Sequence, residues 1–405
     1  MVGHLDADCF YVSAERVRHP DLLGKPVGVL GNQGACVIAK SYEMKAAGVK
    51  TGTPVWDAVK LCPDGVYLKR DFRWYEVLSR AMLDAVGQHA ESVEYYSIDE
   101  FFYRAAPLTR RTGYQHAAAA VRDRIRERTG LPVTVAIART RTLAKLFSDT
   151  AKPNGCVAVT DIDHERALLA RLPLTEISGI GRRRGDRLAP YGINTCLDLA
   201  DADGGLVRRL LTATGHDVWL ELNGRPANPI NPARIPHKML GRGGSLGGAV
   251  RCPHLLFGWL VRNLERLIEE LQFHRVRAGK LSVEVVYKDA PGGYADAPLE
   301  SATDRFDLLL DAARPALRQA YRPHAAATHL HLLATSLRRG QGEQLNLFRP
   351  PCPKLEALAE VKRAINEQVG RFAVRSGATL YLPREIYADP AHSFDVCDIR
   401  GKVCF

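Results

Sequence analysis

The sequence predicts an α+β protein of several domains, and three observations lead to that fold class. The chain has 405 residues, 46% hydrophobic and 25% charged, whereas a single hydrophobic core rarely grows beyond about 250–300 residues. Short strand-like runs mix with amphipathic helical patterns in residues 1–165 and again after residue 239. Between these regions the strand signals vanish, and a proline-rich segment follows.

Residues 1–165 are expected to form a central sheet with helices on one side. Apolar residues in short or alternating runs indicate strands, and a spacing of three to four residues indicates helices. The expected strands lie within 2–12, 27–31, 35–39, 93–103 and 131–138, and the second and third of these form a hairpin. The expected helices are 41–48, 72–90, 115–129 and 140–152. Strand geometry would place Asp6 and Asp8 on one face.

The rest of the chain is expected to contain a helical region, a linker and a second α+β region. Residues 166–222 show short helical patterns only, and residues 223–238 contain four prolines, which favours an exposed, semi-extended linker. In the second region, helices are expected at 254–273 and 304–321 and strands at 280–288 and 328–337. A last helix at 355–369 precedes a tail that ends at Phe405.

Charge and cysteine usage narrow the class of protein. The net charge of +11 favours a polyanionic partner, nucleic acid first, although a basic charge can also serve solubility alone. Nine scattered cysteines without a C-x-x-C pair favour reduced thiols over structural zinc or disulfides. No run of 18 apolar residues and no signal-peptide pattern occurs, so a cytoplasmic protein without a membrane span is expected.

Three carboxylates lie in apolar surroundings. Asp6 lies inside an apolar strand-like run, and Asp99 and Glu100 lie between two others. Buried carboxylates are costly unless they are paired or bind a metal, and hard divalent ions prefer oxygen ligands. Three converging carboxylates would suit two such ions, which can activate a 3′-hydroxyl and neutralise a leaving pyrophosphate. The alternative is that each is an ordinary strand-end or turn residue, and Asp8 is expected to be structural.

The motif D-x-D-x-F-Y near the amino terminus, followed by Y-S-I-D-E at 96–100, resembles the Y-family DNA polymerases, with the bacterial DinB and UmuC types nearest. The resemblance continues in order through 36–50, 142–146 and 151–155 and spans the first 350 residues. It implies a right-hand polymerase with a little finger and a carboxy-terminal tail. The implied domains are a palm (1–17 and 70–165), fingers (18–69), a helical thumb (166–222), a linker (223–238), a little finger (239–340), a clamp-binding segment (341–350) and a tail (351–405).

The same resemblance implies roles for individual residues. Asp6, Asp99, Glu100 and the Ala7 carbonyl would hold two Mg²⁺ ions, with Mn²⁺ as a substitute. Tyr11, beside Phe10, would lie under the nucleotide sugar and reject ribose by overlap, although without the motif it would pass for a core tyrosine. Tyr42, Lys45 and Lys152 would bind the triphosphate, against the alternative of solvated side chains on helices. Three residues depart from the common pattern, namely Lys45 for arginine, Phe101 for alanine and Ala39 for threonine.

Two further segments point to DNA and to a partner protein. Residues 177–193 fit a helix-hairpin-helix, in which Gly179 and Gly181 free backbone N–H groups for phosphate and Arg182, Arg183 and Arg184 add charge. The little-finger sheet is expected in the major groove, with candidate contacts at Arg242, Arg251, Arg262, Arg266, Arg275, Arg277 and Lys280. The pentapeptide Gln344-Leu345-Asn346-Leu347-Phe348 is similar to the segment with which bacterial polymerases bind the sliding clamp, the alternative being a chance apolar turn.

The expected function is template-directed translesion DNA synthesis of low fidelity without proofreading, because no further carboxylate cluster is evident. Primer-template DNA, deoxynucleoside triphosphates and the sliding clamp are the expected partners, with a recombinase or another accessory protein as a further candidate. The alternative is a catalytically silent, clamp-tethered DNA-binding relative, which would typically lack metal ligands. A nucleotidyl cyclase would not explain the helix-hairpin-helix or the clamp peptide.

Overall fold

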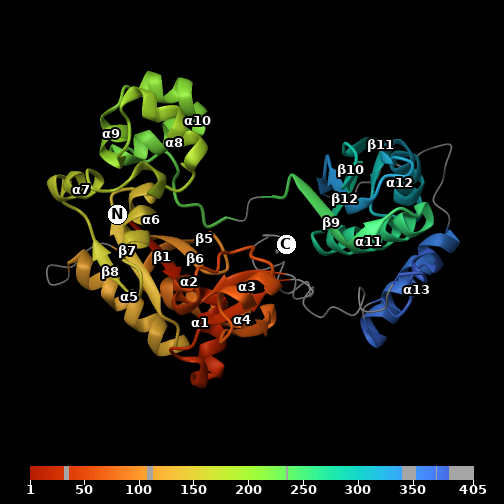
Figure 1. Ribbon diagram of the computed structural model, residues 1–405, viewed down its shortest axis with the longest axis horizontal. Helices are drawn as coiled ribbons and strands as arrows, with labels where there is room; N and C mark the ends of the chain where they lie inside the picture. Colours follow the sequence, from red (N-terminus) through yellow and green to blue (C-terminus); the bar gives the residue numbers. More distant parts are fainter. Residues whose placement is uncertain (32–35, 107–112, 234–235, 340–352, 371, 383–405) are drawn as a thin grey trace. The chain divides into compact units, whose positions relative to one another are not determined.

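The chain divides into two compact units, and the division falls between positions 234 and 235, inside the predicted linker (Figure 1). The computed structural model describes residues 1–31, 36–106, 113–233, 236–339, 353–370 and 372–382. The palm, fingers and thumb expected from the sequence all lie in the first unit, and the expected little finger lies in the second.

The first unit is built on a five-stranded sheet. Its strand order is β5 (Ala90–Tyr95), β6 (Glu100–Ala105), β1 (Val2–Ala7), β7 (Val133–Ala138) and β8 (Cys156–Ala158). Neighbouring strands are antiparallel except for the parallel pair β7 and β8. The chain-distant β1 and β6 therefore lie side by side at the centre of the sheet.

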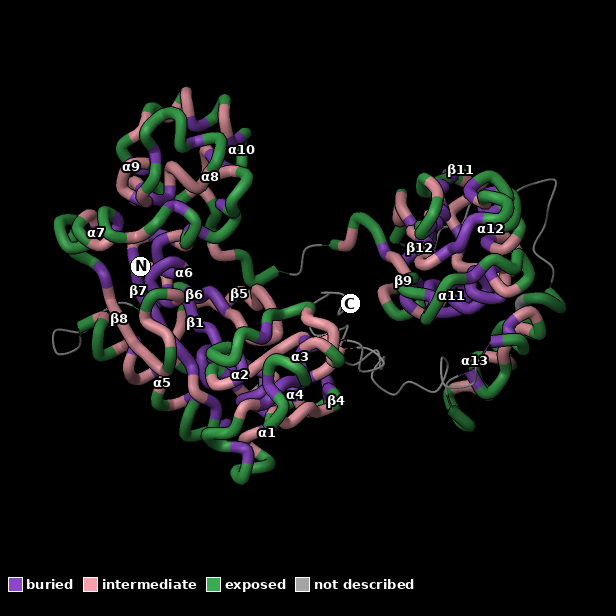
Figure 2. The backbone as a smooth tube through the Cα atoms, in the orientation of Figure 1, coloured by how far each residue is buried: buried purple, intermediate pink, exposed green. Residues whose placement is uncertain are grey.

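Helices cover both faces of this sheet, so the expectation of helices on one side only was wrong. Val133, Val135 and Ile137 of β7 pack in one core with α4 (Phe72–Gly87) and α5 (Tyr114–Thr129). Ala136 and Ala138 pack in another core with α6 (Arg141–Thr150). Every residue of β7 is buried, as Figure 2 shows, and such uniform burial is typical of a strand covered on both faces.

The amino-terminal strand is shorter than expected. Strand β1 ends at Ala7, Cys9 adopts a left-handed conformation with φ of 47°, and α1 (Phe10–Arg18) begins directly after it. Asp8 therefore lies beyond the strand and does not share its face with Asp6. Phe10 and Tyr11 are helical residues, placed at the end of the sheet that carries Asp6.

A small sheet of order β3, β2, β4 completes this part of the first unit. The expected hairpin is confirmed as β2 (Val27–Leu30) paired antiparallel with β3 (Val37–Lys40). The sequence analysis missed β4 (Val66–Lys69), which pairs parallel with β2, and α3 (Val55–Leu61). Helix α2 (Tyr42–Ala46) begins at Ser41, whose hydroxyl accepts a hydrogen bond from the Met44 N–H and so caps the helix.

The expected helical region is also present. It comprises α7 (Ile162–Leu169), α8 (Arg182–Leu188), α9 (Cys196–Asp201) and α10 (Gly204–Leu222), with short 3₁₀ turns at Leu174–Glu176 and Ala189–Tyr191. Asp161, Thr195 and Asp203 cap α7, α9 and α10 with their side chains. These helices share the core that α6 forms beneath the central sheet.

The second unit is an antiparallel sheet covered by two helices on one face. The strand order is β11 (Gly293–Thr303), β10 (Val276–Tyr287), β12 (Ala327–Thr335) and β9 (Met239–Val250), with the short β13 (Arg338–Arg339) beside β10. Helices α11 (Pro253–Phe273) and α12 (Phe306–Ala320) pack on this sheet (Figure 1). Glu284 and its cross-strand partner His331 lie on the opposite face, because their neighbours Val283 and Leu332 point into the core.

Part of the expected tail belongs to the second unit. Helix α13 (Pro353–Val369) contains the predicted last helix, and a 3₁₀ turn follows at Gly377–Thr379. The carboxylate of Glu265 on α11 accepts hydrogen bonds from Lys362 Nζ at 2.5 Å and from the Ser376 N–H at 2.9 Å. Leu382 enters the core of the unit. Residues 353–382 therefore pack back onto α11.

Candidate active site

The central sheet brings the three predicted acidic residues to one place. Asp6 of β1 is the cross-strand partner of Glu100, the first residue of β6. The Ala7 N–H donates a hydrogen bond of 2.9 Å to the carbonyl oxygen of Asp99. More than ninety positions separate these residues in the chain, so the antiparallel pairing of β1 with β6 creates the cluster.

Two lysines from α6 and the loop after it neutralise this cluster. Lys152 Nζ lies 2.8 Å from Asp6 Oδ2 and 3.1 Å from Asp149, and Lys145 Nζ lies 2.5 Å from Glu100 Oε1. Lys145 was not among the predicted site residues. Its partner Glu100 lies forty-five positions away in the chain, so only the fold brings the two together.

Burial sets the electrostatics of the carboxylates. Asp6 is 7% exposed. Its burial raises its pKa to about 8, an effect that Lys152 opposes and the charges of Asp99 and Glu100 reinforce. Burial also raises the pKa of Asp99, although the Ser97 hydroxyl donates a hydrogen bond of 2.6 Å to its carboxylate. The cluster is thus stabilised by positive charge placed beside it.

The carboxylates of Asp6, Asp99 and Glu100 suit hard divalent ions, although Asp6 and Glu100 form ion pairs with lysines in this structure. Within the residues that the structure describes, no three acidic, histidine or cysteine side chains are arranged to hold a metal ion as they stand. Asp6 and Glu100 each accept an ion pair from an ammonium group instead. Carboxylates are the oxygen ligands that Mg²⁺ prefers, so the residue types fit the ion once the ammonium groups move.

Asp8 is a structural residue, as expected. Its carboxylate accepts a hydrogen bond of 2.6 Å from the Asn154 N–H and one of 3.1 Å from Thr134 Oγ1. These bonds tie β7 and the loop of Lys152 to the end of β1. Asp8 therefore fixes the segment that carries the lysine beside Asp6.

Of the two aromatic residues at the start of α1, Phe10 is buried and Tyr11 is partly exposed. The ring of Tyr11 stacks on Tyr75 of α4 with centroids 4.6 Å apart and planes at 16°, and Phe72 meets it edge-on at 5.6 Å. Phe10 is only 3% exposed and packs in the core. Its burial does not support the nucleotide contact expected of Phe10, whereas Tyr11 remains partly exposed.

Tyr42 and Lys45 lie three residues apart on α2 and are both exposed. Burial of its hydroxyl raises the pKa of Tyr42, and the charge of Asp8 raises it further, which places Tyr42 near the acidic end of the sheet. Among the described residues Lys45 forms no ion pair with a carboxylate, so its contact with the triphosphate stays a prediction.

The departure at Phe101 has a simple explanation. Its side chain is 0% exposed and lies 5.3 Å from the ring of Tyr95 within the core that α4 and α5 form. Successive side chains in a strand point to opposite faces. Phe101 therefore points away from Glu100 and leaves the acidic cluster untouched. Ala39 is half-buried in β3 and offers no hydroxyl.

The expected helix-hairpin-helix presents a basic turn. Gly179 has a φ of +90°, which favours glycine, and Ile180 is buried at 1% exposure. Arg182 and Arg183 are exposed at the start of α8. Arg184 instead donates a hydrogen bond of 2.6 Å to the Gly179 carbonyl and so stabilises the turn.

Several basic residues of the second unit are not placed for DNA contacts. Arg242 lies on the helix side of the sheet and pairs with the buried Glu270 of α11, because it alternates in step with the core residue Leu240. Arg262 and Arg266 of α11 are 7% and 8% exposed. Arg251 is exposed and pairs with Asp289 at 3.0 Å. The other candidates lie at or near the start of β10, where Arg275 follows α11, Arg277 lies 3.8 Å from Asp304 and Lys280 pairs with Asp296.

The predicted clamp segment, Gln344, Leu345, Leu347 and Phe348 included, lies outside the described residues. No described helix is long and apolar enough to cross a membrane.

Comparison with known proteins decides the family. The model of the impB/mucB/samB family matches residues 5–149, and the model of that family's carboxy-terminal domain matches residues 237–347. The chain belongs to the impB/mucB/samB family. DNA polymerase IV 1 of Bacillus subtilis is 30% identical over 387 residues, covering 94% of this chain and 93% of the relative. DNA polymerase IV 2 of Mesorhizobium japonicum is 32% identical, with coverage of 82% and 80%.

Protein MucB of Salmonella typhimurium is a further relative of this impB/mucB/samB protein, 29% identical with 91% and 90% of the two chains covered. Among solved structures, a chimera of the Y-family DNA polymerases Dbh and Dpo4 superposes with a TM-score of 0.70 at 22% identity, covering 84% of this chain and 99% of the chimera. The predicted Y-family membership and polymerase fold are confirmed. The chain is a DNA-directed DNA polymerase of the DinB/UmuC type.

Proposed function

We propose that the chain carries out translesion DNA synthesis by nucleotidyl transfer at paired Mg²⁺ ions held by Asp6, Asp99, Glu100 and the Ala7 carbonyl. The observation that supports this most directly is the β1–β6 register, which puts Asp6 opposite Glu100 and bonds Ala7 to Asp99. When bound, the ions would lower the pKa of the primer 3′-hydroxyl and neutralise the leaving pyrophosphate. Manganese would substitute for magnesium with the same oxygen ligands.

Lys152 can balance the negative charge first of Asp6 and then of a bound triphosphate. Lys152 is paired with Asp6 at 2.8 Å before substrate binds. A nucleotide triphosphate brings both metal and negative charge, so Lys152 would leave Asp6 and donate to the phosphate oxygens. Tyr42 and Lys45 of α2 would bind the same triphosphate from the small-sheet side, with Lys45 acting as a point charge where arginine would bind at two points.

Tyr11 would select the sugar. Its ring is held between Tyr75 and Phe72, so it cannot easily turn aside for a 2′-hydroxyl. Steric overlap of this kind rejects ribose without improving deoxyribose binding.

Primer-template DNA would be held without sequence readout. The turn at Gly179 and Gly181, with Arg182 and Arg183 exposed beside it, is suited to backbone phosphates. Arg251 is a second exposed candidate, in the second unit. Low fidelity and the absence of proofreading remain part of this proposal.

The sliding clamp is the proposed protein partner, bound through Gln344, Leu345, Leu347 and Phe348. The described flanks of this segment, β13 and α13, both belong to the second unit. A recombinase or another accessory protein is a further candidate partner. A catalytically silent relative is less well supported, because all three expected acidic residues are present and adjacent.

Primer extension with Asp99→Ala combined with Glu100→Ala tests the proposal. Incorporation should fall by at least about a thousandfold while primer-template binding persists, because removal of metal ligands acts on the chemical step. A matched control, Asp123→Ala with Glu127→Ala, removes two exposed carboxylates of α5, 62% and 69% exposed, and should leave incorporation unchanged. Persistent incorporation by the Asp99/Glu100 variant would refute the metal assignment.

A further inference from the structure

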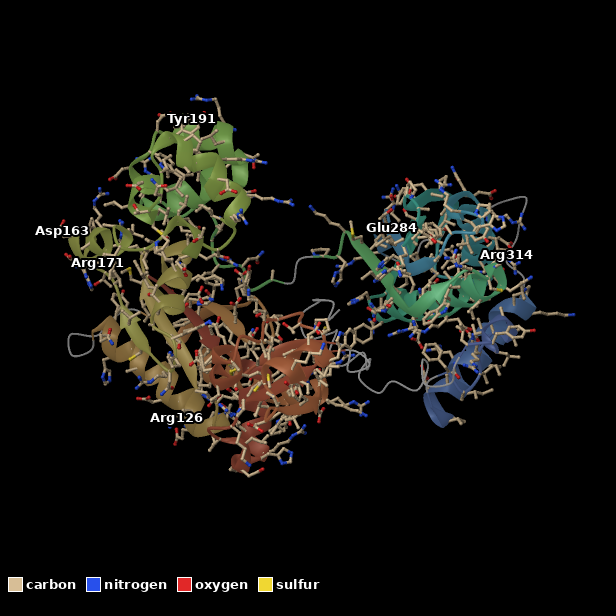
Figure 3. All side chains as sticks on the ribbon, viewed as in Figure 1. Arg126, Asp163, Arg171, Tyr191, Glu284 and Arg314 are labelled. Atoms are coloured by element: carbon tan, nitrogen blue, oxygen red, sulfur yellow. The ribbon has the colours of Figure 1, made fainter. Side chains whose placement is uncertain are left out.

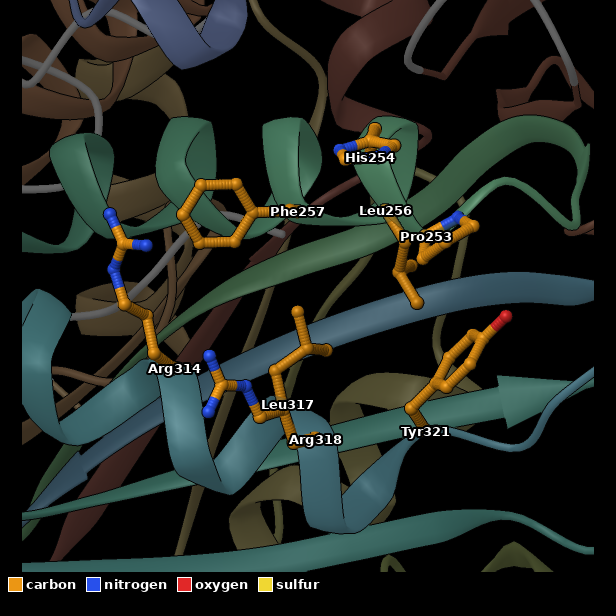
Figure 4. Close-up of a pocket in the computed structure, with 8 residues that line it drawn as sticks. All are labelled: Pro253, His254, Leu256, Phe257, Arg314, Leu317, Arg318 and Tyr321. Carbon is orange, nitrogen blue, oxygen red and sulfur yellow. The ribbon is translucent and has the colours of Figure 1, made fainter.

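A pocket lies between α11 and α12 on the helix side of the second unit (Figure 4). Its volume is about 350 Å³, and its lining consists of Pro253, His254, Leu256, Phe257, Arg314, Leu317, Arg318 and Tyr321. The volume is within the range of sites that bind small molecules or single large side chains. None of these residues belongs to the proposed polymerase site, which lies in the first unit.

The floor of this α11–α12 pocket is apolar. Leu256 and Leu317 are 1% and 7% exposed and belong to the core of the unit. The ring of Phe257 stands beside them in Figure 4, while Pro253 and Tyr321 close one end. A floor of this kind accommodates a large apolar side chain and excludes water from it.

The rim of the pocket is cationic. Arg314 and Arg318 lie one helical turn apart on α12, and His254 lies across from them on α11 (Figure 4). Over the described ranges, neither arginine forms an ion pair or a hydrogen bond. Like charges at this spacing repel each other and destabilise a helix. An anionic partner would remove that repulsion.

Arg314 is also held in place. Its guanidinium lies 4.7 Å from the centroid of the Phe257 ring, close enough for a cation–π contact. A guanidinium stacked in this way is ready to bind a carboxylate at two points.

We propose that the α11–α12 pocket binds an acidic peptide segment of a partner protein, in which carboxylates flank one large apolar side chain. The apolar side chain fills the floor, and the carboxylates bind Arg314 and Arg318. A nucleic-acid backbone matches the rim charge but offers no aliphatic or aromatic side chain for the floor. The pocket also lies on the opposite side of the sheet from the face that carries Glu284 (Figure 3).

Fluorescence anisotropy with the full chain tests this inference. The probe is a labelled peptide of aspartates around one phenylalanine, compared with the same peptide carrying alanine at that place and with an asparagine version. The phenylalanine peptide should bind with a Kd of about micromolar order. Arg314→Ala with Arg318→Ala should weaken it at least about tenfold, and Phe257→Ala should remove its advantage over the alanine peptide.

A matched control removes two exposed arginines from the first unit. Arg126→Ala with Arg171→Ala, both labelled in Figure 3, makes the same change in net charge and should leave peptide binding unchanged. The arginine variants should keep the unfolding midpoint and primer extension of the wild type, because these arginines are exposed and lie outside the polymerase site.

Four results would overturn the inference. One is a Kd that none of these substitutions changes, and another is an equal loss in the control variant. A third is an oligonucleotide that binds more tightly than the peptide and depends on Arg314 and Arg318, which would make this a nucleic-acid site. The fourth is peptide binding that occurs only after removal of residues 383–405, which would identify the chain's own carboxy-terminal segment as the occupant.

Discussion

Tyr11 combines partial exposure with a rigid setting. Its ring stacks on Tyr75 and contacts the ring of Phe72 edge-on. Moving it to make room for the 2′-hydroxyl of a ribose would break both contacts. Tyr11→Ala should raise incorporation of ribonucleotides relative to deoxyribonucleotides by about one hundredfold, equivalent to about 2.7 kcal/mol of lost discrimination. Single-nucleotide incorporation with matched pairs of triphosphates measures this ratio. Tyr11→Phe keeps the ring and should preserve discrimination, and an unchanged ratio in Tyr11→Ala would remove Tyr11 from the sugar site.

Phe101 should affect stability rather than chemistry. It is fully buried on the face of β6 opposite Glu100. Phe101→Ala restores the residue common in relatives but should cost about 3–5 kcal/mol, because it leaves a cavity that only a differently packed core would fill. Phe101→Leu should cost less than about 1.5 kcal/mol. Denaturant unfolding of the first unit measures both, and an equally stable alanine variant would contradict the packing explanation.

At the residue scale, the motifs shared with the Y-family polymerases predicted Asp6, Asp99, Glu100 and Lys152. Taken singly, each carboxylate could have been an ordinary strand-end or turn residue, and Lys145 was not predicted. Lys145 could not be assigned a role, since its partner Glu100 lies forty-five positions away and only the fold joins them. Arg242 was misplaced because a charge in a glycine-rich strand does not reveal which face is buried.

The basic turn before α8 is proposed to bind DNA phosphates through several residues together. Arg182 and Arg183 are exposed beside a turn held by Ile180 and by the bond from Arg184 to Gly179. Arg182→Ala with Arg183→Ala should weaken primer-template binding about equally for all sequences and reduce the salt slope by about 2. Binding titrations over a range of salt concentrations test this. Arg126→Ala with Arg128→Ala on α5 is the control, and an equal change of slope there would rule out a specific role for the turn.

Elements with strong periodicity could be predicted, and short or doubly covered ones could not. The hairpin β2–β3 and helices α4, α5 and α11 lie close to their predicted ranges. Strand β4 pairs parallel with β2 across a long stretch of chain, so no tight turn marks it in the sequence as one marks the hairpin β2–β3. The length of β1 was overestimated because Phe10 and Tyr11 continue its apolar run, whereas Cys9 turns the chain into α1.

The boundary between the two units falls in the proline-rich segment 223–238, which was predicted to be a linker. This boundary could be predicted because proline removes backbone donors and favours extended chain. The role of residues 353–382 could not, since it depends on Glu265, a buried carboxylate that accepts bonds from Lys362 and Ser376. The clamp segment therefore lies between two parts of the chain that are attached to the same unit.

The proposed binding to the sliding clamp is tested on the molecule as a whole. Leu347→Ala with Phe348→Ala should abolish stimulation by the sliding clamp and leave distributive synthesis unchanged, because an extended peptide of this type binds mainly through its apolar side chains. Primer extension with and without clamp, at low enzyme concentration, separates the two activities. The control is Leu355→Ala with Leu358→Ala, which removes similar apolar area from two leucines of α13 that are 44% and 63% exposed. If the clamp stimulates both double variants equally, the pentapeptide is not the docking segment. If stimulation is lost only in the Leu347/Phe348 variant, the polymerase binds the clamp through this segment.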